Sequence, residues 1–179
     1  MHIVMITGSP HRHGASALLA EEFLRGAQEA GHTVFRFDTA SECVHPCIGC
    51  ERCACGENPC VFQDAMRELY RELPGADMVV FVSPLYYHAM SSQIKMAIDR
   101  FHGIDNALRG SGKKAMLLMT AADREEHIFR GAAGSYHEMV WYLGWQDCGM
   151  LLCGGCYTRE DIEKTGYPQK AYALGRALQ

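Results

Sequence analysis

Short apolar segments alternate along this chain with amphipathic segments of helical periodicity. The expected strands are residues 3–6, 33–37, 78–82, 115–119 and 148–152. The expected helices are residues 16–30, 64–73, 91–102, a segment that begins at Ser135, and a last one with Pro168 in its first turn. The strand at 78–82 is apolar at every position, which is typical of a parallel strand covered on both faces. The alternation predicts an α/β fold with a doubly wound parallel sheet.

Size and composition narrow the classes of protein. We expect one domain from 179 residues, and 48% apolar with 21% charged residues exclude a disordered chain. Seventeen Lys and Arg against 21 Asp and Glu, with no basic stripe, indicate neither a nucleic-acid nor a membrane-surface partner. No apolar run approaches the ~20 residues of a membrane span. The first residues lack the pattern of a signal peptide, so we expect a cytoplasmic protein.

The first loop at the carboxyl edge of the expected sheet has the character of a phosphate site. It runs from Thr7 to Ser16 and joins a buried strand to a helix. A helix N-terminus offers free N–H groups and partial positive charge, while Gly8 and Gly14 allow close approach of the backbone. The loop matches neither the Walker nor the dinucleotide pattern. The alternative is a polar turn in which Ser16 only caps the helix.

The loop after the third strand, Ser83 to Met90, is apolar and aromatic. Such a loop at the mouth of a parallel sheet predicts a flat ligand, with Tyr86 or Tyr87 stacked on its ring. The alternative is that the tyrosines pack or make contacts between subunits. Residues 120–134, after the fourth strand, lie at the same edge.

Taken together, these segments resemble the NADPH-dependent FMN reductase family of the flavodoxin superfamily. The resemblance rests on Gly8-Ser9-Pro10 and on Ser83-Pro84-Leu85-Tyr86-Tyr87, followed by Ser92-Gln93-Ile94-Lys95 and Ile98-Asp99-Arg100. The chain departs from the family at His11, where Arg is frequent, and at Ala15, where Asn is frequent; Arg12 supplies the charge. The resemblance implies a flavodoxin-like three-layer sandwich with strand order 2-1-3-4-5, and a homodimer or higher homo-oligomer.

The resemblance also implies which residues meet FMN. Those at the phosphate would be Ser9, Arg12, Gly14, Ala15, Ser16 and Ala17. Those at the isoalloxazine would be Pro84, Leu85, Tyr86, Tyr87, Thr120, Ala121 and Ala122. No catalytic side chain is expected, because the flavin itself carries the reactivity toward NAD(P)H.

Six of the nine cysteines lie between positions 43 and 60. The spacing Cys47-x2-Cys50-x2-Cys53, with Cys60 further on, suits a tetrahedral zinc or a [4Fe–4S] cluster. The order resembles the iron–sulfur flavoproteins, a branch of the same family, and this resemblance makes these four cysteines the ligands. The alternative is a thiol-rich segment without metal. Cys153-Gly154-Gly155-Cys156 reads as a turn, at most a weak redox pair.

Three functions follow as hypotheses. The first is an FMN-dependent oxidoreductase that passes electrons between NAD(P)H and flavin or a small acceptor. The second is an iron–sulfur flavoprotein that carries electrons to or from a redox partner protein. The third is a zinc-bound, non-enzymatic binding module on the same scaffold, against which the aromatic loop argues because it would have nothing to stack on.

Overall fold

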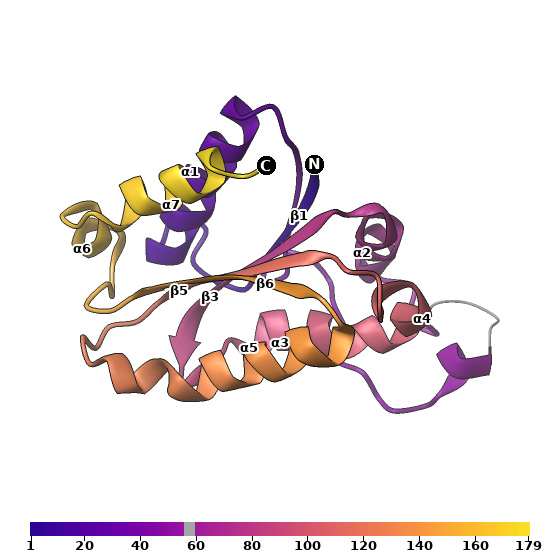
Figure 1. Ribbon diagram of the computed structural model, residues 1–179. Coiled ribbons are helices and arrows are strands. Elements are labelled where there is room, and N and C mark those ends of the chain that lie inside the picture. Colours follow the sequence, from indigo (N-terminus) through magenta and orange to yellow (C-terminus); the bar gives the residue numbers. More distant parts are fainter. Residues whose placement is uncertain (56–59) are drawn as a thin grey trace.

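A twisted parallel sheet forms the centre of the computed structural model, which describes residues 1–55 and 60–179 (Figure 1). Its parallel strands are β1 (His2–Thr7), β2 (Thr33–Asp38), β3 (Met78–Tyr86), β5 (Lys114–Thr120) and β6 (Gln146–Cys153). They lie in the order β2-β1-β3-β5-β6, which confirms the doubly wound, flavodoxin-like arrangement. The labels differ from the expected 2-1-3-4-5 because a two-residue strand, β4 (Ala89–Met90), pairs antiparallel with β3.

Helices cover both faces of the sheet and complete three layers (Figure 1). One face carries α1 (Ala15–Glu29), α6 (Arg159–Glu163) and α7 (Tyr167–Arg176). The other carries α2 (Met66–Glu72), α3 (Ser92–Asp99), α4 (Asp105–Leu108) and α5 (Arg130–Leu143). In β1 the side chains alternate between the layers, with Ile3 and Met5 under α1 and Val4 and Ile6 under the other helices. Both faces of the inner strands β1, β3 and β5 are buried, which explains why these strands are mostly apolar, whereas the edge strands β2 and β6 also carry polar residues.

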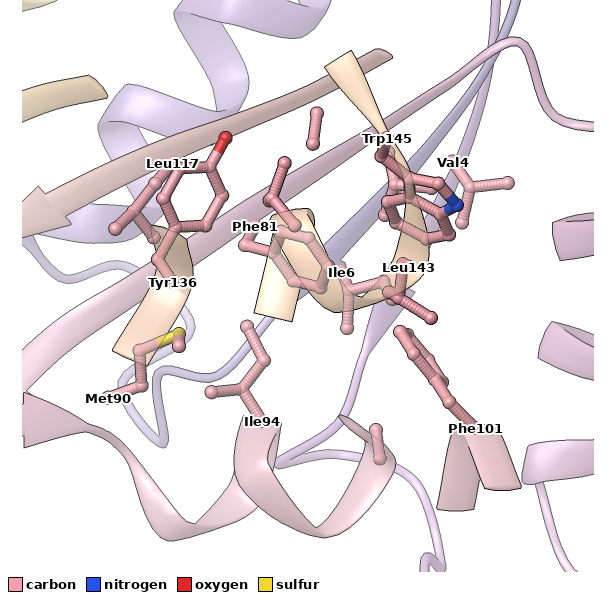
Figure 2. Close-up of a cluster of buried hydrophobic side chains, with 14 of the residues drawn as sticks. Val4, Ile6, Phe81, Met90, Ile94, Phe101, Leu117, Tyr136, Leu143 and Trp145 are labelled. Atoms are coloured by element: carbon pink, nitrogen blue, oxygen red, sulfur yellow. The ribbon is translucent and has the colours of Figure 1, made fainter. Parts of the chain in front are cut away.

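Aromatic side chains fill the layer between the sheet and α3 and α5 (Figure 2). Phe81 lies between Phe101 and Tyr136, with ring centroids 6.4 and 6.3 Å away. The polar tips are satisfied, since Trp145 Nε1 donates to the Leu108 carbonyl at 2.8 Å and Tyr136 Oη donates to Asp147 at 2.9 Å. This packing fixes α3, and therefore the loop that precedes it.

Two glycines let α1 and α7 cross with their backbones in contact. A Cβ atom on Gly26 would lie 2.2 Å from the Tyr172 carbonyl oxygen, and one on Gly175 would lie 2.2 Å from that of Phe23. No side chain fits at either position. The contact with α7 fixes the position of α1. The N-terminus of α1 lies at the carboxyl edge of the sheet.

The structure corrects two expectations about element boundaries. The strand expected at 78–82 continues to Tyr86 and turns back through Tyr87 and His88, whose φ angles are +47° and +62°. The expected aromatic loop is therefore a hairpin. The spacing of Ser135 and Glu138 predicted a helix start, but α5 begins at Arg130, directly after the 3-10 turn Glu126–Phe129. In the described part of the chain, no helix has the length and apolarity needed to cross a membrane.

Candidate functional site

A cleft of about 600 Å³ opens at the carboxyl edge of the sheet. This volume lies within the ~300–1,000 Å³ of small-molecule sites, and the place is the one where open α/β sheets bind ligands. The cleft is lined by the loop before α1, the end of β3, the loop after β5 and the loop after β6. Its lining residues are Ser9, His11, Arg12, His13, Gly14, Ala15, Ser16, Pro84, Leu85, Tyr86, Thr120, Ala121, Ala122, Tyr157 and Thr158.

One end of the cleft is the N-terminus of α1. The N-cap, Gly14, provides no side-chain hydrogen bond, and the first turn of the helix leaves its backbone N–H groups free for a ligand. Ser16 is 3% exposed and lines the cleft. Within residues 1–55 and 60–179, its hydroxyl has no hydrogen-bond partner. Among the described residues no side-chain polar atom is both buried and unpaired, so this hydroxyl is accessible from the cleft and open to a ligand such as a phosphate oxygen.

The phosphate end extends into a second cavity of about 440 Å³. The two cavities share Ser9 and Ser16, and the second one also contains Ala17, the remaining residue predicted at the phosphate. Arg12 borders both cavities and is exposed, so its positive charge is available at the mouth. The residues predicted at the phosphate therefore all line these two adjoining cavities.

The other end of the cleft has a less polar lining. Pro84, Leu85 and Tyr86 form one wall, and the loop from Thr120 to Ala122 forms another. Burial raises the pKa of the Tyr86 phenol above its ordinary value. Tyr87 is fully exposed, at 102% of its reference area, and is not part of the cleft lining. The structure thus brings together all the predicted ring contacts except Tyr87.

Two buried serines connect the two ends of the cleft. Ser91 Oγ donates to the Gly8 carbonyl at 2.6 Å, and the Ser91 N–H donates to Ser83 Oγ at 2.9 Å. The approach is so close that a Cβ atom on Gly8 would lie 2.4 Å from Ser91 Oγ. The sequence placed Ser91 only at a helix start, because a contact between residues so far apart along the chain leaves no local pattern.

Sequence reasoning also missed the contribution of the loop after β6. Tyr157 and Thr158 line the cleft there, directly after the turn Cys153–Cys156. The turn is fastened to the loop after β5 by paired backbone bonds, from Ala121 N–H to Cys153 O and from Cys156 N–H to Ala121 O. The available signal was topological, since a fifth parallel strand also ends at the carboxyl edge.

The thiols of the turn are structural. Cys153 and Cys156 are 0% and 2% exposed, and burial, followed by their mutual proximity, raises the pKa of the Cys153 thiol. Burial also raises the pKa of the Cys156 thiol. Thiols held protonated and away from solvent are poor nucleophiles, so this pair is not built for redox exchange.

The four predicted metal ligands lie on one segment between β2 and α2. Cys47 and Cys50 are exposed, whereas Cys53 and Cys60 are partly buried, and all four are free thiols. The Gly49 N–H donates to Cys47 Sγ at 3.5 Å. Four thiols suit zinc or iron by their chemistry. However, among residues 1–55 and 60–179 no three His, Cys, Asp or Glu side chains are gathered so that they could hold a metal ion.

Comparison with known proteins finds relatives that are named iron–sulfur flavoproteins. An iron–sulfur flavoprotein of Methanocaldococcus jannaschii is 34% identical over 100 residues, 56% of this chain and 51% of that protein. One from Archaeoglobus fulgidus is 30% identical over 130 residues, 72% of this chain and 59% of that protein. The chain thus spans between half and two thirds of the length of these relatives.

An NAD(P)H:quinone oxidoreductase from Methanothermobacter marburgensis has the same fold. Its TM-score is 0.79 at 22% identity, and the alignment covers 100% of this chain and 96% of that one. The family described as NADPH-dependent FMN reductase matches residues 1–146. Most of the sheet and nearly all of the cleft lie within these residues, and the chain belongs to the NADPH-dependent FMN reductase family.

Proposed function

We propose that the cleft binds FMN and that the protein is an FMN-dependent oxidoreductase, which passes electrons from NAD(P)H to flavin or a small acceptor. The observation that carries the proposal is the open N-terminus of α1, where Ser16 lines the cleft and its hydroxyl has no partner among the described residues. It fits the phosphate of a ligand whose flat ring meets Pro84, Leu85 and Tyr86 at the other end. Family membership supports the same cofactor.

The residues of the cleft bind and orient, and none acts as an acid or base. The flavin supplies hydride and single-electron chemistry when it is bound. The N–H groups of the first turn of α1 and the Ser16 hydroxyl hold the phosphate, while Arg12 balances its charge. The small side chains of Ala121 and Ala122 leave room for a planar ring beside the backbone of that loop. Tyr157 lies at the mouth, where an acceptor would enter.

The test is oxidation of NADPH and NADH by the FMN-loaded protein with a quinone as acceptor, followed by absorbance at 340 nm. We expect turnover that depends on FMN and is lost when the cleft is altered by Ala121→Trp. The matched control is Gly75→Ala, at a position where a Cβ atom meets nothing within 4 Å. Turnover without flavin, or turnover unaffected by the tryptophan, would contradict the proposal.

A second candidate function is that of an iron–sulfur flavoprotein. It is favoured by the spacing Cys47-x2-Cys50-x2-Cys53 with Cys60, on a segment whose described thiols are all free. The names of the relatives point the same way. Iron and zinc should be assayed after purification without oxygen. About four irons per chain support this candidate, consistent with a [4Fe–4S] cluster. Zinc without flavin would instead support the non-enzymatic module, and neither metal would leave the FMN oxidoreductase alone.

A further inference from the structure

A buried ion pair lies at the C-terminal end of α3, outside the cleft. Arg100 is 1% exposed, and the Asp64 side chain is 2% exposed. The guanidinium donates to both carboxylate oxygens, at 2.9 Å to Oδ2 and 3.1 Å to Oδ1. Arg100 Nε also donates to the Tyr70 hydroxyl at 3.3 Å, and that hydroxyl donates to the Arg100 carbonyl at 2.8 Å. The pair is therefore fully hydrogen-bonded in a fixed geometry.

The same two side chains hold His45 by three further bonds. Arg100 Nη1 donates to the His45 carbonyl at 2.8 Å, and Asp64 Oδ2 accepts from the His45 N–H at 3.0 Å. His45 Nδ1 lies 3.1 Å from the same oxygen. The ring of His45 stacks on Phe62, with centroids 4.8 Å apart and planes at 8°. The network thus binds both the backbone and the side chain of His45.

The residues of this network lie on both sides of the cysteine segment in the sequence. His45 stands two residues before Cys47, while Phe62 and Asp64 follow Cys60. Asp64 also begins the next helix, because its Oδ1 accepts from the Met66 N–H at 3.2 Å. The ion pair therefore joins the stretch that enters the cysteine segment to the stretch that leaves it. The 3-10 turn Arg52–Cys55 contacts the turn Arg100–Ile104 as well.

Helix α3 connects this network to the phosphate loop. Its N-cap, Ser91, is bonded to Gly8 beside the cleft, whereas Arg100 follows its last residue. At 1.5 Å per residue the two anchors are roughly 13 Å apart along the axis. One short helix therefore fixes the loop of the cleft at one end and the cysteine segment at the other.

Stability alone does not explain a buried ion pair, because well-packed apolar residues of similar volume are often as stabilising. We propose that Arg100 and Asp64 are positioning residues, which hold the described stretches 45–54 and 60–63 in one arrangement before any metal or partner binds. The inference depends on the iron–sulfur candidate only for what the thiols would bind, and not for how they are held.

The test measures alkylation of each cysteine by iodoacetamide, followed by mass spectrometry of the metal-free, reduced protein. The variants are Arg100→Lys, which keeps the charge and loses the fork, and Asp64→Asn, which loses the charge. The control is Asp99→Asn, which removes only the exposed pair with Lys95 on the same helix. We expect Cys53 and Cys60 to react at least tenfold faster in Asp64→Asn, less so in Arg100→Lys, and unchanged in the control.

Two control measurements distinguish a local loss of positioning in the cysteine segment from destabilisation of the whole fold. Cys153 and Cys156 are buried on the opposite side of the sheet, and their reactivity should not change in any variant. Affinity for FMN should stay within twofold of the parent protein. Unchanged rates at Cys53 and Cys60 in both variants, or rates that rise equally at Cys153 and Cys156, would overturn the inference. A parent protein that binds no FMN would contradict the proposed function and leave this result standing.

Discussion

At the scale of single residues, the clearest mark of function is a hydroxyl that the described chain does not satisfy. Little of Ser16 is exposed, but its hydroxyl is accessible from the cleft and has no partner among the described residues, at an open helix N-terminus. Residues 10–13 of the loop are exposed, whereas Ser16 is held at the start of α1, where its hydroxyl can donate to a phosphate oxygen. The assignment can be tested by removing one oxygen atom.

We predict that Ser16→Ala weakens FMN binding about tenfold or more, because a hydrogen bond to a charged group contributes about 1.5–3 kcal/mol. Binding of riboflavin, which has no phosphate, should change little. Quenching of flavin fluorescence measures both affinities. Ser92→Ala, on the exposed start of α3, is the matched control. Equal losses for FMN and riboflavin would contradict a role at the phosphate.

The buried thiols of the Cys153–Cys156 turn give a second prediction at this scale. In the native protein at pH 8, a thiol reagent should modify Cys47 and Cys50 quickly, and should leave Cys153 and Cys156 unmodified until the chain unfolds. The double substitution Cys153→Ala, Cys156→Ala should keep NADPH oxidation within about twofold of the parent. A loss of turnover with FMN still bound would mean that the pair takes part in electron transfer.

The position of a residue in the cleft could be predicted where a local sequence pattern indicates it. Glycines and serines in a strand-to-helix loop are typical of a phosphate site, and the residues predicted there from this pattern do line the cleft and the adjoining cavity. Tyr157 was not predicted at the cleft, because the segment before it was interpreted only as a turn with two cysteines. Tyr87, which was predicted at the ring, does not line the cleft, because its direction depends on a hairpin turn with positive φ that the sequence pattern did not indicate. Ser91 required the tertiary contact with Gly8.

At the scale of elements, the packing of α7 against α1 fixes the helix whose N-terminus forms one end of the cleft. Gly26→Ala would place a methyl group 2.2 Å from a backbone oxygen of α7. We predict a loss of about 1–3 kcal/mol or more in the free energy of unfolding, as for other overpacked positions. Urea unfolding measures it.

The matched control for this substitution is Gly134→Ala, on an exposed turn of α5 where a Cβ atom meets nothing within 4 Å. That change should stabilise the protein by roughly 0.5–1 kcal/mol, because alanine is the better helix former. If both substitutions changed stability by the same amount and sign, the crossing of the two helices would not depend on the close approach at Gly26.

Elements with strong periodicity were predicted within a few residues, and α1 and β5 are examples. The start of α5 was not. Ser135 and Glu138 have the spacing of a capping box, but they lie on the exposed side of a helix that is already formed at Arg130. The preceding 3-10 turn buries Ile128 and Phe129 in the core, and this packing fixes the true start. Local spacing cannot report such a tertiary contact.

At the scale of the whole molecule, the ion pair of Asp64 and Arg100 makes stability depend on pH. Burial opposes ionisation of the Asp64 carboxyl, but hydrogen bonds from Arg100 and His45 outweigh it and lower its pKa from 3.8 to about 2. Because the folded state favours the ionised form, this contribution is complete above the unfolded pKa and is lost as the pH falls from about 4 to 2.

We therefore predict that about 2 kcal/mol of the free energy of unfolding disappears across that range. Asp64→Asn should lower stability at pH 7 and should reduce its further fall between pH 5 and pH 2. Asp99→Asn, which changes an exposed carboxylate of the same helix region, serves as control. Urea unfolding at each pH gives the curves. Parallel curves for the parent and Asp64→Asn would refute the assignment.

We propose that the whole molecule is organised around an FMN site in the cleft at the carboxyl edge, with the phosphate at the N-terminus of α1. The most direct measurement is a titration of the flavin-free protein with FMN and, separately, with riboflavin, monitored by flavin fluorescence. We predict one FMN per chain and an affinity at least tenfold higher for FMN than for riboflavin, because the phosphate has charge-assisted partners. Equal affinities, or no binding of either flavin, would contradict it.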